Sequence, residues 1–245
     1  MQAVVLAGGE GTRLAPYTRV LPKPLLPVGD RPILEIIIGQ LRDAGITDVV
    51  LATGYLSGLI EAYFGDGSAF GVDISYSREH APLGTAGPLA GIDGLDTTFV
   101  LMNGDCLSDL DLLALVGAHE ASGATATIAS HVEEVDVDFG VLQLDGDGVV
   151  SAIDEKPRYL VEVSMGVYVF EPRVLELIDP GVYLDFPDLV TALIARGDRV
   201  EAFRHSGSWV DLGRVRHLEE VAQALGGSAE EVVAERAADP REVPS

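Results

Sequence analysis

The stretch that decides the fold runs from residue 3 to residue 14 and reads AVVLAGGEGTRL. Its first five residues, Ala3 to Ala7, form a short apolar run, which predicts a buried strand that leads into a glycine-rich loop. Glycines in such a loop let backbone N–H groups approach an anion without a side-chain clash. The loop is ambiguous as a bare pattern. Leu14 stands where a dinucleotide fingerprint has its third glycine, and the Gly-Lys-Ser/Thr of a P-loop is missing.

Outward from this first strand, helical and extended patterns alternate along the first half of the chain. We expect strands at 48–53, 72–77 and 98–102, and helices at 32–44, 56–64, 85–90 and 111–122. Alternating strands and helices predict a largely parallel sheet that is covered on both faces. The predicted fold class is therefore α/β.

The middle of the chain changes to consecutive strands. We expect strands at 125–132, 141–144, 149–153 and 161–170, with a hairpin turn at the DGDG of residues 145–148. Further helices are expected at 173–178, 188–196 and 215–224, and further strands at 200–204 and 208–210. The sequence thus predicts one domain over residues 1–226, followed by an acidic helix and tail over residues 227–245.

Composition and charge exclude several classes of protein. The chain has 245 residues, 47% of them hydrophobic, and a formal net charge of −23. Such an acidic surface repels nucleic acids and anionic lipids, so neither is an expected partner. A single cysteine, Cys106, rules out an internal disulfide, and no apolar run reaches membrane-spanning length. We expect a soluble cytoplasmic protein, with its oligomeric state left open and a homo-oligomer compatible with the sequence.

One segment departs from the acidic background. Residues 1–31 contain four basic residues and two acidic ones, Glu10 and Asp30. The basic ones include Arg13 in the glycine loop and Lys23, which lies between prolines in the stretch PKPLLPV of residues 22–28. Arginine and lysine together can clamp a polyphosphate and stabilise charge that builds up on a leaving group. The segment therefore predicts an anionic ligand.

Five ordered blocks then give the chain a resemblance. They are GGEGTRL with PKPLLPV, PLGTAG (82–87), NGD (103–105), EKP (155–157) and WVDLG (209–213). In this order they resemble the sugar-1-phosphate nucleotidyltransferases, most of all those that act as mannose- or heptose-1-phosphate guanylyltransferases. The resemblance implies a Rossmann-like three-layer sandwich with a mostly parallel central sheet and a small additional β region for the sugar. It also implies that a sugar 1-phosphate attacks the α-phosphorus of a nucleoside triphosphate and releases pyrophosphate.

The resemblance assigns the triphosphate to the N-terminal blocks. Arg13 is expected to meet the transition-state charge and Lys23 the departing pyrophosphate. Glu10 is expected to point to solvent or to pair with Arg13 when the site is empty. The nucleotide is expected to contact Leu6, Ala7, Gly8, Gly9, Gly11, Thr12, Gly84, Thr85 and Asn103.

A magnesium ion and a sugar site complete the expected constellation. Asp105 follows an apolar strand, where ligands of open α/β sheets collect, and Mg²⁺ takes a few carboxylates plus water and phosphate oxygens. By resemblance, Asp211 is the second metal ligand. Also by resemblance, the sugar 1-phosphate is expected to contact Gly140, Glu155, Lys156 and Ser164. Ser164-Met165-Gly166 departs from the Asn-Ala-Gly common in the family, and Ser lacks the amide donor of Asn.

The choice of substrates stays open between readings. Residues 82–87 look most like the loop of guanylyltransferases, and the Gln usual upstream of it in thymidylyl- and uridylyltransferases is missing. We expect GTP with a manno- or heptose-type sugar 1-phosphate. The alternatives are a thymidylyl- or uridylyltransferase acting on glucose 1-phosphate, or a catalytically silent regulatory subunit that binds a nucleotide sugar. Thr85 also fits a helix cap. Cys106 fits a small buried residue better than a nucleophile.

Overall fold

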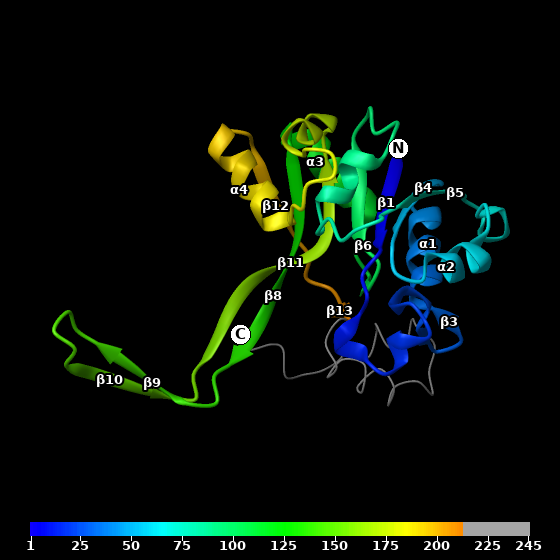
Figure 1. Ribbon diagram of the computed structural model, residues 1–245. Coiled ribbons are helices and arrows are strands. Elements are labelled where there is room, and N and C mark those ends of the chain that lie inside the picture. Colours follow the sequence, from blue (N-terminus) through cyan, green and yellow to red (C-terminus); the bar gives the residue numbers. More distant parts are fainter. Residues whose placement is uncertain (213–245) are drawn as a thin grey trace.

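A seven-stranded sheet forms the centre of the computed structural model, which describes residues 1–212 (Figure 1). The strand order is β12-β8-β11-β6-β1-β4-β5. On one side β1 (Gln2–Ala7) pairs in parallel with β4 (Asp48–Thr53), which pairs in parallel with β5 (Asp73–Arg78). On the other side β1 pairs in parallel with β6 (Phe99–Asn103). The expected parallel half of the sheet is confirmed.

The remaining strands make the sheet mixed. They are β8 (Ala126–Asp136), β11 (Arg158–Phe170) and β12 (Val200–Arg204). β11 is antiparallel to both β6 and β8, whereas β12 is parallel to β8. The chain leaves β8, turns back through the hairpin of β9 (Gly140–Leu144) and β10 (Val150–Glu155) and returns in β11, so β8 and β11 run antiparallel.

Both faces of the sheet are covered by buried apolar side chains. Alternate residues of β1 point to opposite faces: Ala3 and Val5 belong to one core cluster and Val4 to the other, and all three are fully buried. The first cluster includes side chains of α1 (Ile33–Asp43), α2 (Ser57–Phe64) and α3 (Leu112–Ser122). The second includes side chains of α4 (Phe186–Arg196). The expected three-layer α/β architecture is confirmed.

Several short elements differ from the sequence-based prediction. The helices expected at 85–90 and 173–178 are the 3-10 helices η5 (Gly87–Gly91) and η6 (Pro172–Leu177). Each has a proline in its first turn and is too short to repay the cost of nucleating an α-helix. Residues 12–25 form three further 3-10 turns: η1 (Thr12–Leu14), η2 (Tyr17–Arg19) and η3 (Lys23–Leu25).

Short ladders outside the main sheet were not predicted. β2 (Pro27–Val28) pairs with β3 (Arg31–Pro32), and β7 (Cys106–Ser108) pairs with β13 (Trp209–Asp211). Two- and three-residue strands leave no periodic pattern in a sequence. The second of these ladders joins the end of β6 to the end of the described chain.

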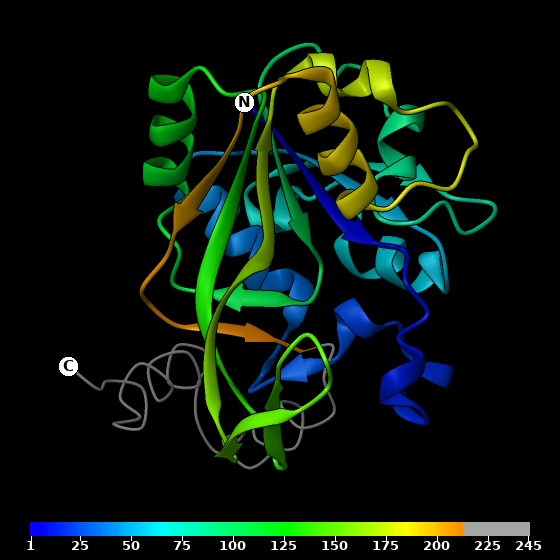
Figure 2. The same cartoon turned by 90° about the vertical axis from the view of Figure 1, so that its left-hand side faces the viewer.

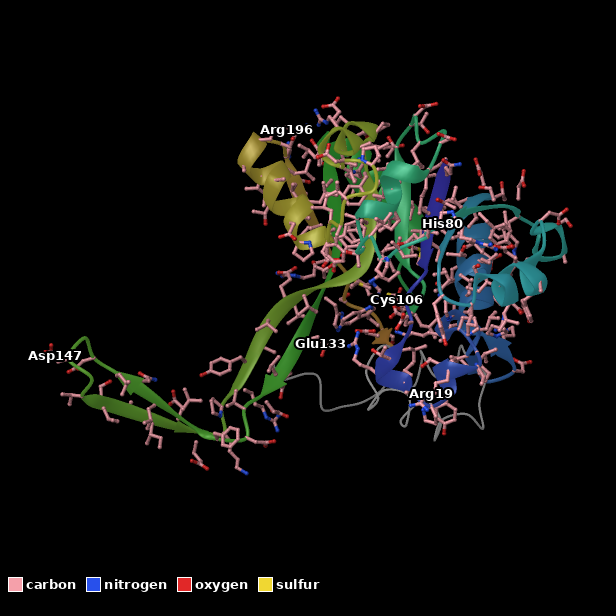
Figure 3. The ribbon with its side chains drawn as sticks, in the orientation of Figure 1. Arg19, His80, Cys106, Glu133, Asp147 and Arg196 are labelled. Carbon is pink, nitrogen blue, oxygen red and sulfur yellow. The ribbon has the colours of Figure 1, made fainter. Side chains whose placement is uncertain are left out.

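An arm projects from the body of the molecule. β8 and β11 run past the other strands and carry a hairpin of β9 (Gly140–Leu144) and β10 (Val150–Glu155) (Figures 1 and 2). The expected turn at residues 145–148 is confirmed, because the Asp145 carboxylate accepts hydrogen bonds from the backbone N–H groups of Asp147 and Val149. Asp147 marks the tip of the arm, away from Cys106 in the body (Figure 3).

Two expectations concern the end of the chain and its relation to membranes. The helix predicted at 215–224 and the acidic segment 227–245 lie outside the described residues. None of the helices in residues 1–212 combines the length and the apolar composition that crossing a membrane requires.

Candidate functional site

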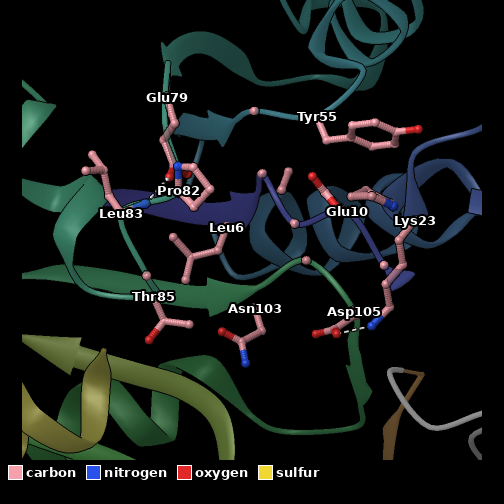
Figure 4. Close-up of a pocket in the computed structure, with 18 of the residues that line it drawn as sticks. Leu6, Glu10, Lys23, Tyr55, Glu79, Pro82, Leu83, Thr85, Asn103 and Asp105 are labelled. Atoms are coloured by element: carbon pink, nitrogen blue, oxygen red, sulfur yellow. Dashed lines mark hydrogen bonds and ion pairs between the residues drawn. The ribbon is translucent and has the colours of Figure 1, made fainter. Parts of the chain in front are cut away.

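A cavity of about 860 Å³ opens at the carboxyl ends of β1, β4, β5 and β6 (Figure 4). The loops that follow these four strands form its walls. In open α/β sheets ligands bind at this edge, because the loops there converge and the sheet holds them in place. Most of the residues expected to bind the nucleotide line this cavity: Leu6, Ala7, Gly8, Gly9, Gly11, Gly84, Thr85 and Asn103.

Close backbone crossings shape the bottom of the cavity. The N–H of Gly104 donates a hydrogen bond of 2.9 Å to the carbonyl of Leu6, and a Cβ at Gly104 would lie 2.5 Å from that oxygen. A Cβ at Gly8 would lie 2.7 Å from a carboxylate oxygen of Glu79, which is the end of a flexible side chain and can move aside. Gly104 is therefore required by the packing of neighbouring strand ends, whether or not an anion is bound.

Lys23 forms an ion pair with Asp105 inside this cavity (Figure 4). Lys23 lies in η3, where Pro22 and Pro24 flank it and restrict its backbone. Its side chain is only 11% exposed and that of Asp105 is 26% exposed. A charge with so little access to water needs a partner. The structure therefore places a cation in the cavity together with the carboxylate that neutralises it.

The glycine loop carries two more charged residues into the cavity. Arg13 and Glu10 both line it, and both are exposed to solvent. Glu10 is exposed to solvent, which is the first of the two arrangements that were expected for it. Thr12, expected beside the nucleotide, is exposed and is not among the lining residues.

A second cavity of about 140 Å³ adjoins the first and shares Asn103 and Asp105 with it. Ser164 and Asp211 also line this second cavity. Asp211 arrives there because β13 pairs with β7, which places it opposite Cys106, next to Asp105 in the chain. The β7–β13 ladder is thus what brings the two expected metal ligands to one cavity.

The pKa of the Cys106 thiol is affected by the charged groups around the second cavity. Burial raises its pKa to about 12, and the nearby carboxylates of Asp105 and Asp211 add to that rise, although a hydrogen bond from the Trp209 indole N–H opposes it. The Sγ atom also donates to the Met165 carbonyl at 3.0 Å. Cys106 is a buried, neutral thiol whose sulfur both donates and accepts a hydrogen bond. The sequence predicted a buried residue here.

Three of the expected sugar contacts lie elsewhere. Gly140 and Glu155 face each other across the first pair of the β9–β10 hairpin, and Lys156 follows in a left-handed conformation with φ of 49°. All three lie on the arm and line neither of the two cavities. Their assignment to the sugar phosphate stays a prediction.

Other residues of the cavity were not found by sequence reasoning. Glu79 follows the pattern of an ordinary strand end, and burial raises its pKa while a hydrogen bond from the Leu83 N–H partly offsets the rise. Tyr183 and Asp185 enter from the segment before α4. The only signal at Asp185 is its place before a helical pattern, which predicts a cap and not a binding-site residue.

Comparisons with known proteins show which sequences this chain is similar to. Residues 2–227 match the family model described as nucleotidyl transferase. The chain is 36% identical over 235 residues to a UTP–glucose-1-phosphate uridylyltransferase of Synechocystis sp., and 36% identical over 219 residues to a mannose-1-phosphate guanylyltransferase of Mycobacterium tuberculosis. These alignments cover 88% and 87% of this chain, and the chain spans 61% of the length of each of the two relatives.

A solved structure has a similar fold. It is that of a Bacillus anthracis protein assigned as a glucose-1-phosphate thymidylyltransferase, in complex with sucrose. The two chains superpose with a TM-score of 0.74 at 26% identity, over 92% of this chain and 95% of the other. This similarity extends over nearly the whole of both chains.

The crossing at Gly104 generates a testable prediction. Gly104→Ala places a methyl group against the fixed Leu6 carbonyl, so it is expected to lower the free energy of unfolding by about 1–3 kcal/mol, the usual cost of overpacking. Gly9→Ala is the matched control, because a Cβ at Gly9 meets nothing within 4 Å. Urea denaturation measures both. Equal stability of the two variants would contradict the crossing.

Proposed function

This chain belongs to the sugar-1-phosphate nucleotidyltransferase family, and on that premise we propose that it transfers a nucleoside monophosphate from a nucleoside triphosphate to a sugar 1-phosphate. An oxygen of the sugar phosphate forms a bond to the α-phosphorus. The bond between the α-phosphorus and its bridging oxygen to the β-phosphate breaks, and pyrophosphate leaves with the electron pair. GTP and a manno- or heptose-type sugar 1-phosphate are the proposed substrates.

The pairing of Lys23 with Asp105 in the cavity carries this proposal. Phosphoryl-type transfer depends on positioning and on neutralising charge more than on a covalent nucleophile. Lys23 is held between prolines and nearly buried, so its ammonium group supplies a fixed positive charge to the departing pyrophosphate. Arg13, on the neighbouring glycine loop, supplies a second positive charge to the transition state.

A magnesium ion fits the residues at the junction of the two cavities. Asp105 and Asp211 supply carboxylate oxygens, and within residues 1–212 no group of three or more His, Cys, Asp or Glu side chains is arranged around a metal. Two carboxylates completed by water and phosphate oxygens are the usual surroundings of Mg²⁺, not of zinc. When bound, Mg²⁺ would neutralise phosphate oxygens of the triphosphate. In this proposal Lys23 pairs with the phosphates in place of Asp105, and the Asp105 carboxylate then binds the metal.

The base is proposed to lie at the other end of the large cavity. Arg13 and Lys23 mark the phosphate end. Glu79, Pro82 and Leu83 lie at the other end and contain neither lysine nor arginine (Figure 4). A carboxylate only accepts hydrogen bonds, and guanine presents two adjacent donors, its N1–H and its N2 amino group. Uracil and thymine present one donor between two carbonyl acceptors, which a carboxylate repels. Glu79 therefore supports the choice of guanine.

Sequence similarity also supports other substrates. A uridylyltransferase and a guanylyltransferase are both 36% identical to this chain, so a uridylyl- or thymidylyltransferase acting on glucose 1-phosphate is the second candidate. A silent regulatory subunit is the third candidate. It is less favoured because Arg13, Lys23, Asp105 and Asp211 are all present.

Pyrophosphate release tests the proposed function directly. Each nucleoside triphosphate is incubated with Mg²⁺ and with mannose 1-phosphate, a heptose 1-phosphate or glucose 1-phosphate. We expect release with GTP and a manno- or heptose-type sugar. Release with UTP or TTP and glucose 1-phosphate would replace the proposed substrates by the second candidate. If no pair is turned over while a nucleotide sugar binds, the regulatory subunit becomes the better account.

Removing the charge of Asp105 tests its role in catalysis. Asp105→Asn keeps the shape of the side chain and an acceptor for Lys23, yet loses the negative charge that a metal needs. We expect turnover to fall by at least about 100-fold, the loss typical for a group that stabilises developing charge. Asp111→Asn is the control, since Asn caps a helix as well as Asp does. Turnover near the wild-type rate in Asp105→Asn would refute the assignment.

Exchanging Glu79 tests the base. Glu79→Gln replaces one carboxylate oxygen by an amide donor, so it no longer accepts both guanine donors. The kcat/KM for GTP is expected to fall by about 10- to 100-fold, as when a buried polar group loses its partner, with a relative gain for UTP. Glu61→Gln, at a surface ion pair with Arg78, controls for loss of charge. An unchanged ratio of kcat/KM for GTP and UTP would separate Glu79 from base recognition.

A further inference from the structure

A segment far along the chain holds the PLGTAG loop of residues 82–87 in place. The backbone of Leu184 donates a hydrogen bond to the carbonyl of Leu83 at 2.9 Å. The carbonyl of Leu184 in turn accepts from the N–H groups of Ala86 at 2.9 Å and Gly87 at 3.0 Å. The loop is thus paired to residues 182–186, which comprise the end of the connection from η6 and the first residue of α4.

Two glycines of the loop are explained by this contact. A Cβ at Gly84 would lie 2.5 Å from the Leu184 carbonyl and 2.9 Å from Oδ1 of Asp185. A Cβ at Gly87 would lie 2.8 Å from the carbonyl of Val182. Gly84 also has a φ of 79°, in the left-handed region that favours glycine. The loop therefore approaches residues 182–186 as closely as two backbones can.

Asp185 is the side chain that fastens this contact. It occupies the N-cap position of α4 with an extended backbone, where an aspartate usually accepts a hydrogen bond from the helix that it precedes. Its carboxylate makes no such bond to α4. Pro187 has no N–H to offer, and the N–H of Asp188 donates instead to the backbone carbonyl of Asp185 at 3.1 Å.

The carboxylate caps the loop instead of the helix. Oδ1 of Asp185 accepts from the N–H of Thr85 at 2.9 Å and from its hydroxyl at 3.1 Å. The same hydroxyl accepts from the N–H of Phe186, the first residue of α4, at 2.9 Å. Asp185 thus caps the backbone of the loop at Thr85, and the Thr85 hydroxyl caps the first N–H of α4. This hydroxyl uses its donor and one of its acceptor sites.

The second carboxylate oxygen is also held. It accepts from the hydroxyl of Tyr183 at 2.7 Å. The bond from Tyr183 is the main cause that lowers the pKa of Asp185 below its usual value, and the bonds from Thr85 add to it. The carboxylate is therefore favoured in its charged form. Tyr183, Asp185, Gly84 and Thr85 all line the large cavity.

We propose that Asp185 is a positioning residue for the nucleotide: through Thr85 it fixes the PLGTAG loop in the conformation that faces the base. This inference rests on the proposed function for its ligand. The hydroxyl of Thr85 is committed to α4, so the loop offers its backbone and not this side chain as the fixed surface. The loop's position is set by a helix that begins about 100 residues later in the chain.

Steady-state kinetics test the positioning role. Asp185→Ala removes both bonds to Thr85, and we expect the KM for the triphosphate to rise about tenfold, in line with the loss of two hydrogen bonds. The kcat and the KM for the sugar 1-phosphate are expected to change by less than about twofold, because Asp185 contacts neither the reacting phosphates nor the sugar in this proposal. Asp185→Asn keeps an oxygen that accepts the same two bonds, so it is expected to recover most of the affinity.

A matched cap serves as the control. Asp111 is the N-cap of α3, and its carboxylate accepts from the N–H of Ala114 at 2.9 Å. Asp111→Ala removes an aspartate from the same N-cap position of another helix, outside both cavities, so it is expected to lower thermal stability without raising the KM for the triphosphate. If Asp185→Ala and Asp111→Ala behaved alike in kinetics, Asp185 would be a structural cap and the proposal would be overturned.

Hydrogen exchange keeps the test independent of turnover. The amides of residues 83–87 are expected to exchange at least about tenfold faster in Asp185→Ala than in the wild type or in Asp111→Ala, because opening of the loop costs less. Faster exchange together with a wild type that turns over no triphosphate would refute the proposed function and leave the contact between loop and helix intact. Unchanged exchange in Asp185→Ala would overturn the inference itself.

Discussion

Every part of the candidate site depends on the parallel pairing of β1 with β4 on one side and β6 on the other. This pairing brings the ends of three strands to one edge, where Gly8, Gly54 and Gly104 let the backbones cross. The pairing is secured by burial, because Val4 and Val5 are inaccessible to solvent on opposite faces of the sheet. Full burial of such a side chain stabilises a fold by about 1.5–3 kcal/mol. The rigid sheet can therefore hold loops whose conformations serve a ligand.

Charge explains why the site is built around an ion pair. A chain with a net charge of −23 repels polyanions at a distance, so an anionic ligand needs a local concentration of positive charge. Lys23 provides that charge with little exposure to water, and Asp105 neutralises it within the cavity. Exchange of the carboxylate for a phosphate group would keep the ammonium paired throughout, which avoids the cost of a buried, unpaired charge.

The two cavities and the arm divide the molecule into regions with different supports. The large cavity is lined by strand ends and by Tyr183 and Asp185, and the small one by residues of the β7–β13 ladder. The arm is held by its own hairpin register and by the Asp145 turn. Residues assigned to a sugar phosphate therefore fall into two groups, with Ser164 in the small cavity and Gly140, Glu155 and Lys156 on the arm.

The sequence by itself determined much of the local structure. The strand at 48–53 has the predicted bounds, and the hairpin turn at 145–148 forms as expected, because apolar periodicity and turn residues act within a few positions of the chain. Lys23 and Asp105 were also found from the sequence, each from its immediate neighbours. Only the tertiary structure decided that Asp211 shares a cavity with Asp105, that Glu79 faces Gly8, and that Asp185 caps Thr85 across 100 positions. Such contacts join segments remote in the chain, and their partners are set by the sheet order and by packing, which no local pattern encodes.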